Sequence, residues 1–319
     1  MHVAPELARW RADRPVREAA RQAARTRASP VAAETALGRF AAALPALAPE
    51  GIAEAAMALL ADPGWLDALL APAIAALRAD PFFGVPFRAI DNGVQSGLLL
   101  LDRPEAAVAV SLVTPARLAA RKRAAAGPRV IAFSGYDSCI RVLRAGGARL
   151  AFWAATPPDD GFSLATAPPC RYLGRRTLQD GALLRVDGRR ESFVVEHAEA
   201  PLLLVQASIK AGAAPFALDF DPGTLACVGA GSTDDGAGRV ELLAGLLGAI
   251  RHPRGGEALA ACLGTLPFHA RWRVMREWLA LDAGRARIGL AAMAAGDPHP
   301  ELRAAAAVAL ARMGEPCPA

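Results

Sequence analysis

The spacing of apolar positions changes twice along the chain and divides it into three predicted segments. From residue 1 to about 90, apolar residues recur at helical spacing, which predicts helices over 34–48, 51–61 and 65–79. Proline and glycine separate these runs, for example at Asp62-Pro63-Gly64. Residues 1–90 are therefore predicted to form an N-terminal helical region.

Residues 91–231 contain short apolar runs with turn residues between most of them, the pattern of an antiparallel β-sandwich or barrel. One helix is predicted, over 115–127. Asp187-Gly188 separates two alternating runs and predicts a two-residue hairpin turn with positive φ at both positions. The predicted strands lie at 93–102, 107–114, 129–135, 138–143, 148–155, 170–178, 182–186, 191–197, 201–209, 216–221 and 224–231.

Residues 239–319 return to helical spacing and repeat at a period near thirty residues. Helices are predicted over 240–250, 272–281 and 302–313, with 256–266 and 284–295 between them. In the last helix, Leu302, Ala305 and Ala309 share one side, and we expect that side to be buried against the two preceding helices. Arg303 is expected to point toward a carbonyl or carboxylate of the turn before it.

Two family resemblances add to this pattern. The stretch DPHPELRAAAAVALARM, residues 297–313, resembles a HEAT repeat, which implies an α-solenoid stack that presents a surface to a protein partner. The middle segment resembles the cupin jelly roll (double-stranded β-helix), but YDSCIRVLRA between Gly135 and Gly146 has no histidine where that family holds its metal. The predicted fold is α+β: a cupin-like sandwich flanked by N-terminal helices and HEAT-like helices, with no metal and no cofactor.

Composition and charge narrow the cellular setting. No apolar run reaches the ~18 residues of a membrane span, and no secretory leader is evident. The five cysteines are scattered, without a C-x-x-C pair, which argues against disulfides and structural zinc. Only two of the 36 basic residues are lysine, a bias that fits a GC-rich genome better than a nucleic-acid partner. We expect a cytoplasmic protein without a membrane partner.

Candidate binding residues come from the sandwich. Tyr136, Arg141, Arg144, Arg190 and His197 could contact a small-molecule ligand, although strand alternation favours an outward direction for Arg141. No nucleophile motif is present, so no catalytic residue is predicted.

Each of two short motifs has a structural and a functional interpretation. His197-Ala198-Glu199 contains the His-x-Glu part of a non-haem iron triad, but the downstream histidines all lie in the helical segment. The stretch GAGSTDDGAG lacks the Lys of a phosphate loop, and we expect Ser232, Thr233 or Asp234 to cap the following helix instead.

Three function classes remain at this point. The leading hypothesis is a non-enzymatic binding, regulatory or scaffold protein. One alternative is a cupin-type or non-haem iron oxygenase that uses His197 and Glu199. The other is nucleic-acid binding through the arginine-rich first thirty residues and a second arginine group: Arg271, Arg273, Arg276, Arg285 and Arg287.

Overall fold

A computed structural model describes residues 33–79, 83–123, 130–158, 162–164 and 166–314, with isolated positions 13, 15, 18 and 19. It confirms a mixed helical and antiparallel-sheet fold. The described chain divides into two compact units, which interleave in sequence. Of the described residues, the first unit holds those within 1–129, 136–154 and 171–213, and the second holds those within 130–135, 155–170 and 214–319.

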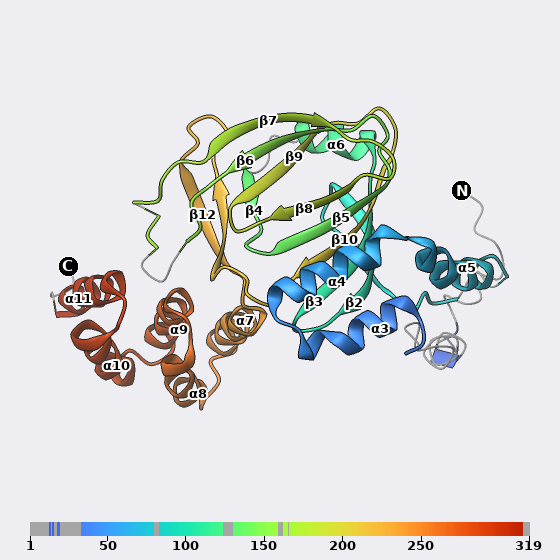
Figure 1. The fold of residues 1–319 in the computed structure, drawn as a ribbon. Helices are drawn as coiled ribbons and strands as arrows, with labels where there is room; N and C mark the ends of the chain where they lie inside the picture. The colour runs from blue at the N-terminus through green and yellow to red at the C-terminus, as the bar shows by residue number, and fades with distance from the viewer. Residues whose placement is uncertain are drawn as a thin grey trace. The chain divides into compact units, whose positions relative to one another are not determined.

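The first unit is built on a six-stranded and a three-stranded antiparallel sheet (Figure 1). From β5 to β10 the chain passes repeatedly between these two sheets, and β10 lies between β3 and β5. This is the connectivity of a jelly roll. The larger sheet has the order β1 (Arg88–Asp91), β2 (Gln95–Asp102), β3 (Ala106–Val113), β10 (Leu202–Ile209), β5 (Asp137–Arg144), β8 (Leu183–Asp187); the smaller has β7 (Arg171–Thr177), β6 (Arg149–Ala154), β9 (Glu191–His197).

Side-chain alternation gives the larger sheet two buried faces. On β5, Ile140 and Val142 enter the core between the two sheets, while Cys139 points to the opposite side. On β10, Leu204 enters the core between the two sheets, and Val205 points to the opposite side. Because both faces are covered, these strands are richer in apolar residues than strands with one solvated face.

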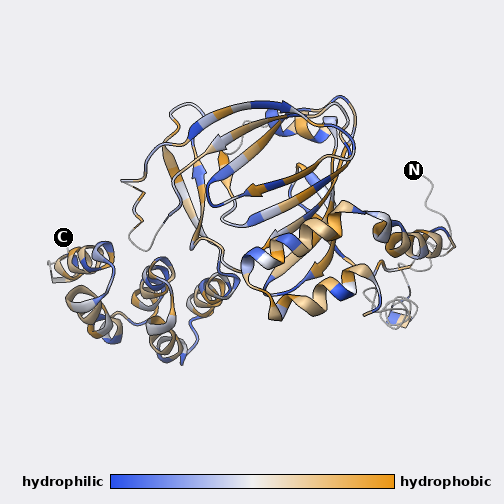
Figure 2. Ribbon diagram, in the orientation of Figure 1, coloured by the Kyte–Doolittle hydropathy of each residue, from blue (hydrophilic) through white to orange (hydrophobic). Residues whose placement is uncertain are grey.

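Helices cover the outer face of the larger sheet (Figures 1 and 2). Thr35 caps the first of them through a hydrogen bond from the Gly38 amide, 3.0 Å long. The second buries Ile52, Ala53 and Leu60 against the sheet. The helices of this unit are α3 (Ala36–Ala43), the 3-10 turn η1 (Leu44–Ala46), α4 (Pro49–Ala61), α5 (Gly64–Ala79) and α6 (Pro115–Arg123).

Among the described residues, no single helix has both the length and the apolar content to cross a bilayer. Only α4 and α5 taken together pass that test, and the chain bends by 67° between them.

The second unit joins a small sheet to a series of helices. The sheet has the order β12 (Cys227–Ser232), β11 (Phe216–Phe220), β4 (Ile131–Phe133). Phe216 of β11 packs edge-on against Phe268 and His269 at the start of α9, so aromatic contacts join the sheet to the helices. The helices are α7 (Asp235–Ala249), α8 (Gly255–Cys262), the 3-10 turn η2 (Leu263–Thr265), α9 (Phe268–Leu281), α10 (Ala283–Gly296) and α11 (Pro300–Gly314).

The predicted elements are largely present, with ends shifted by a few residues. Each of the eleven predicted strands overlaps one of β2–β12, whereas β1 was not predicted. The N-cap of α7 is Asp234, one of the three residues expected to cap this helix. Its side chain accepts hydrogen bonds from the Gly236 and Ala237 amides at 2.7 and 3.2 Å. The small sheet belongs to the second unit, so the predicted 91–231 segment is shared between the units.

The predicted Asp187-Gly188 hairpin is wrong. The turn runs from Asp187 to Arg190, closed by an Arg190 amide to Asp187 carbonyl bond of 2.8 Å, and neither Asp187 nor Gly188 has positive φ. The strands on either side belong to different sheets, since β8 pairs with β5 and β9 with β6. The dipeptide therefore connects the two layers of the sandwich.

Candidate functional site

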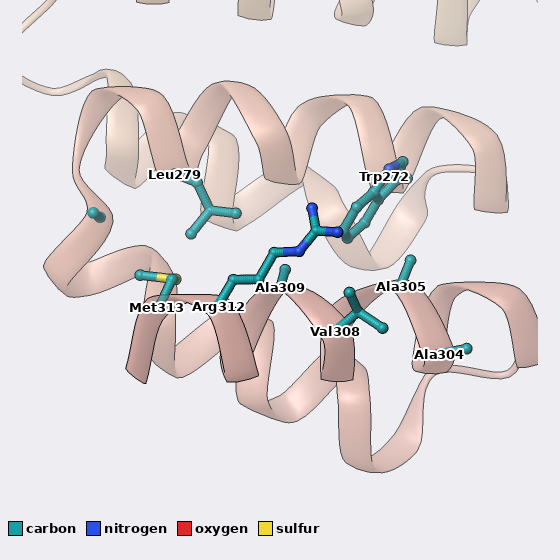
Figure 3. Close-up of a pocket in the computed structure, with 9 residues that line it drawn as sticks. Trp272, Leu279, Ala304, Ala305, Val308, Ala309, Arg312 and Met313 are labelled. Atoms are coloured by element: carbon teal, nitrogen blue, oxygen red, sulfur yellow. The ribbon is translucent and has the colours of Figure 1, made fainter. Parts of the chain in front are cut away.

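An apolar groove between α9 and α11 is the clearest candidate binding site in the second unit (Figure 3). Its volume is about 690 Å³. Trp272 and Leu279 form one wall, seven residues apart and therefore on one face of α9. The opposite wall and the ends are Ala283, Ala304, Ala305, Val308, Ala309, Arg312 and Met313.

The packing of α11 explains why the groove stays open. Leu302 and Ala306 are buried, 4% and 0% exposed, and α11 packs chiefly on α10. Ala305 and Ala309 are only partly buried and face the groove. Of the face expected to be buried, Leu302 is therefore buried as predicted. The same expectation is wrong for Ala305 and Ala309, because α11 is rotated so that Ala306 makes the close contact.

Charged groups hold the start of α11 in place. The buried carboxylate of Asp297 receives two hydrogen bonds from Arg271, of 2.8 and 2.9 Å. Arg303 donates to the carbonyls of Asp297 and Pro298 at 2.6 and 3.0 Å, which confirms its predicted direction. These contacts orient α11 relative to α9 and so set the position of the groove walls.

The groove carries positive charge and no negative charge. Arg312 is its single charged lining residue among those described, and its side chain extends across the opening toward Trp272 (Figure 3). Arg276, four residues after Trp272 on α9, is also exposed. Within the described chain, neither arginine has a carboxylate partner. An approaching group therefore meets an apolar floor and a cationic rim.

The five predicted ligand contacts do not meet in one place. Tyr136 precedes β5, and its carbonyl accepts from Gly188, so Tyr136 lies beside the turn that contains Arg190. Arg144 ends β5 and His197 ends β9, at the opposite end of the sandwich. An eight-residue strand spans roughly 25 Å, too far for one small ligand. Arg141 lies on the face of β5 away from the inter-sheet core, as alternation predicts.

His197 and Glu199 are both exposed at the end of β9. The described residues contain no group of three or more His, Cys, Asp or Glu side chains placed to hold a metal ion. These two residues thus lack a third ligand in that part of the chain.

The first unit contains a charged network that the sequence pattern did not indicate. Arg185 of β8 donates to both Glu50 oxygens, at 2.5 and 2.7 Å, and to Asp137 Oδ2, at 2.6 and 3.0 Å. Beside it, burial chiefly raises the pKa of the Cys139 thiol to about 12, which makes this thiol unreactive. The network joins α4 to the sheet, and its members are too far apart in sequence for a local motif.

A smaller polar set lies among the inward-facing positions of the larger sheet. The Gln206 amide donates to Ser138 Oγ at 3.2 Å and to Ser208 Oγ at 3.1 Å. These hydrogen bonds satisfy buried polar groups within the sandwich.

The arginines considered for nucleic-acid binding are partly occupied by carboxylates. Arg271 pairs with Asp297, Arg273 with Glu241, and Arg285 with Asp282 at 3.6 Å. Arg276 and Arg287 are exposed. The arginines of the first thirty residues lie outside the described residues.

No protein-family profile and no curated protein matches the chain by sequence. By structure it is similar to hydroxypropylphosphonic acid epoxidase from S. wedmorenis, with 14% sequence identity and a TM-score of 0.23. This match covers 39% of this chain and 56% of the epoxidase chain. It is similar to capsular polysaccharide assembling protein CapF from Staphylococcus aureus: 9% identity, 46% and 34% coverage, TM-score 0.25. A third is a cupin-superfamily sugar phosphate isomerase from Silicibacter pomeroyi: 13% identity, 44% and 78% coverage, TM-score 0.22.

The chain thus spans about half the length of the epoxidase and a third of CapF. At these TM-scores and identities, the similarities carry no information about activity.

Proposed function

We propose that this protein is a binding protein whose HEAT-like helical unit holds an amphipathic helix of a partner protein in the groove between α9 and α11. The observation that carries the proposal is the groove itself: an open apolar channel between two helices, with a cationic rim. Repeated helix pairs typically bind partners through surfaces of this kind.

The shape of the groove favours a helix as the occupant. Four alanines line it, and small side chains let a third helix approach to the usual interaxial distance of about 8–10 Å. Trp272 offers a large, partly buried aromatic surface, the residue type that most often anchors an interface. An inserted helix would present apolar residues at i, i+3, i+4 and i+7.

The charge of the rim favours an acidic partner. Arg312 lines the groove, and the exposed Arg276 lies one helical turn after the lining residue Trp272 on α9. Glutamate or aspartate beside the apolar stripe of the partner would pair with these arginines. Rim charges of this type act mainly on partner selection and association rate. The occupant is therefore an amphipathic helix with acidic flanks.

The test uses a designed peptide of about five helical turns (~18 residues), with leucine along one face, glutamate elsewhere and a terminal fluorophore. Fluorescence anisotropy with the full-length protein should give a dissociation constant of about 1–100 μM. Val308→Asp places a charge on the groove wall and should weaken binding by at least ~10-fold. Ile288→Asp is the matched control, because Ile288 is more exposed than Val308, 77% against 53%, and lies outside the groove.

A peptide with lysine in place of glutamate should bind more weakly, because the rim is cationic. The proposal is overturned if the glutamate peptide does not bind at ~1 mM, or if both aspartate variants weaken binding equally.

A further inference from the structure

A second pocket of about 530 Å³ lies in the helical unit, apart from the groove, where the α7–α8 and α9–α10 connections meet. Its lining is polar and carries both signs of charge, unlike the groove. The charged and histidine residues are Arg251, His252, Glu277, Asp282 and Arg285.

Two of these charges already compensate each other. Asp282 caps α10 by accepting from the Arg285 amide at 3.1 Å, and its carboxylate lies 3.6 Å from the Arg285 guanidinium. The side chains of Arg251 and Glu277 have no ion-pair or hydrogen-bond partner within the described chain. The pocket therefore offers one uncommitted cation and one uncommitted anion.

Arg251 occupies a backbone conformation that arginine rarely adopts. Its φ is +47°, at the position just after α7 where a helix usually ends on glycine. The His252 amide bonds back to the Leu247 carbonyl at 3.0 Å, which closes the helix in the glycine-type manner. Residues in such strained backbone conformations are found mainly at functional sites.

Two side chains with ring N–H groups lie at the pocket: His252 lines it, and Trp278 lies beside the lining residue Gly256. His252 Nδ1 accepts from the Arg254 amide at 3.2 Å, so the neutral imidazole carries its proton on Nε2. Trp278 is 8% exposed, and its indole Nε1 is buried without an acceptor. This nitrogen lies against the pocket residue Gly256, where an added Cβ would be only 3.1 Å from it.

Glycines also keep the acidic side open. A Cβ added at Gly248 would lie 2.8 Å from a Glu277 carboxylate oxygen. Both Gly248 and Gly256 line the pocket, so the missing side chains leave space beside a carboxylate and a buried donor.

We infer that this pocket binds a small zwitterion of the amino-acid class. The ligand carboxylate would pair with Arg251 and accept a hydrogen bond from His252, while the ligand ammonium would pair with Glu277. A simple anion would leave the charge of Glu277 uncompensated. A simple cation would leave the charge of Arg251 uncompensated. The pocket volume of about 530 Å³ is large enough for a molecule of this class.

The experiment is isothermal titration of the full-length protein with each of the twenty common amino acids at about 10 mM. At least one should bind, and its decarboxylated and deaminated analogues should each bind at least ~10-fold more weakly. Arg251→Gly should abolish binding without lowering the melting temperature, because glycine relieves the positive φ. Glu277→Gln should weaken binding of the zwitterion at least ~10-fold.

Arg254→Gln is the control, since Arg254 is in the same connection, is 81% exposed and does not line the pocket. It should bind as the unsubstituted protein does. The inference fails if no amino acid in the set binds, or if binding is unchanged in both Arg251→Gly and Glu277→Gln. Neither result bears on the α9–α11 groove, which is tested with a different probe.

Discussion

Replacement of Arg185 by methionine should destabilise the first unit severely. Methionine keeps most of the length of the side chain but removes the guanidinium that bridges Glu50 and Asp137. Asp137 is the partner that matters, since its side chain is 8% exposed, whereas that of Glu50 is 66% exposed. Asp137 Oδ1 already lacks a hydrogen-bond partner, so Arg185 supplies the charged contacts of this carboxylate.

The size of the effect follows from burial. Removal of one partner from a buried ion pair typically costs about 3–5 kcal/mol, because an uncompensated charge is left behind. Arg185 is 35% exposed, and water admitted at that side would lower the cost. We therefore expect Arg185→Met to reduce the free energy of unfolding of the first unit by about 3 kcal/mol.

A double-mutant cycle with Asp137→Asn separates charge compensation from packing. In the Asp137→Asn background there is no buried charge, so Arg185→Met should cost only about 1 kcal/mol. The coupling between the two positions should then be about 2 kcal/mol. Hydrogen exchange of peptides from β5 and β8, followed by mass spectrometry over a urea series, reports on the first unit alone.

The reasoning is refuted if Arg185→Met costs less than about 1 kcal/mol with Asp137 intact, or if Asp137→Asn leaves that cost unchanged. The first result would mean that Asp137 is solvated without Arg185. The second would mean that the arginine acts through its hydrocarbon chain.

Three further predictions concern other buried groups. Ala306→Leu should lower the melting temperature and reduce the free energy of unfolding by about 1–3 kcal/mol, because Ala306 is fully buried. Ala304→Leu, on the exposed side of α11, should leave the melting temperature unchanged, and equal melting of both variants would contradict the observed packing of α11. Burial chiefly lowers the pKa of His269 below 6.5, so the second unit should lose stability as the pH falls from about 7 to 5. In melting experiments over this pH range, His269→Phe should reduce the loss of stability, and a pH profile identical to that of the unsubstituted protein would be inconsistent with a buried neutral imidazole. Cys139, with its pKa of about 12, should react with iodoacetamide at pH 8 far more slowly than the partly exposed Cys262, as measured by mass spectrometry; equal rates would show that the site opens.

The sequence alone determined the type and the approximate extent of most elements. Strand runs and helical periods predicted β2–β12 and the helices from α3 to α11, because alternation and the 3.6-residue period are local properties of a chain with one or two buried faces. The cap at Asp234 and the direction of Arg303 were also predictable, since each bonds to backbone within six residues.

Tertiary structure decided which elements pair. Asp187-Gly188 is a strong local hairpin pattern, yet β8 and β9 join different sheets, because the partners of a strand depend on residues far away in sequence. Periodicity places Ala305, Ala306 and Ala309 on α11 but does not say which of them meets α10, and a rotation of the helix by one residue exchanges a buried face for a groove. Arg185, Glu50 and Asp137 come from three distant segments, so their meeting required the complete sandwich with α4 packed on it. Local patterns thus specify what each segment can become, and the free energy of packing between distant segments selects the faces and partners.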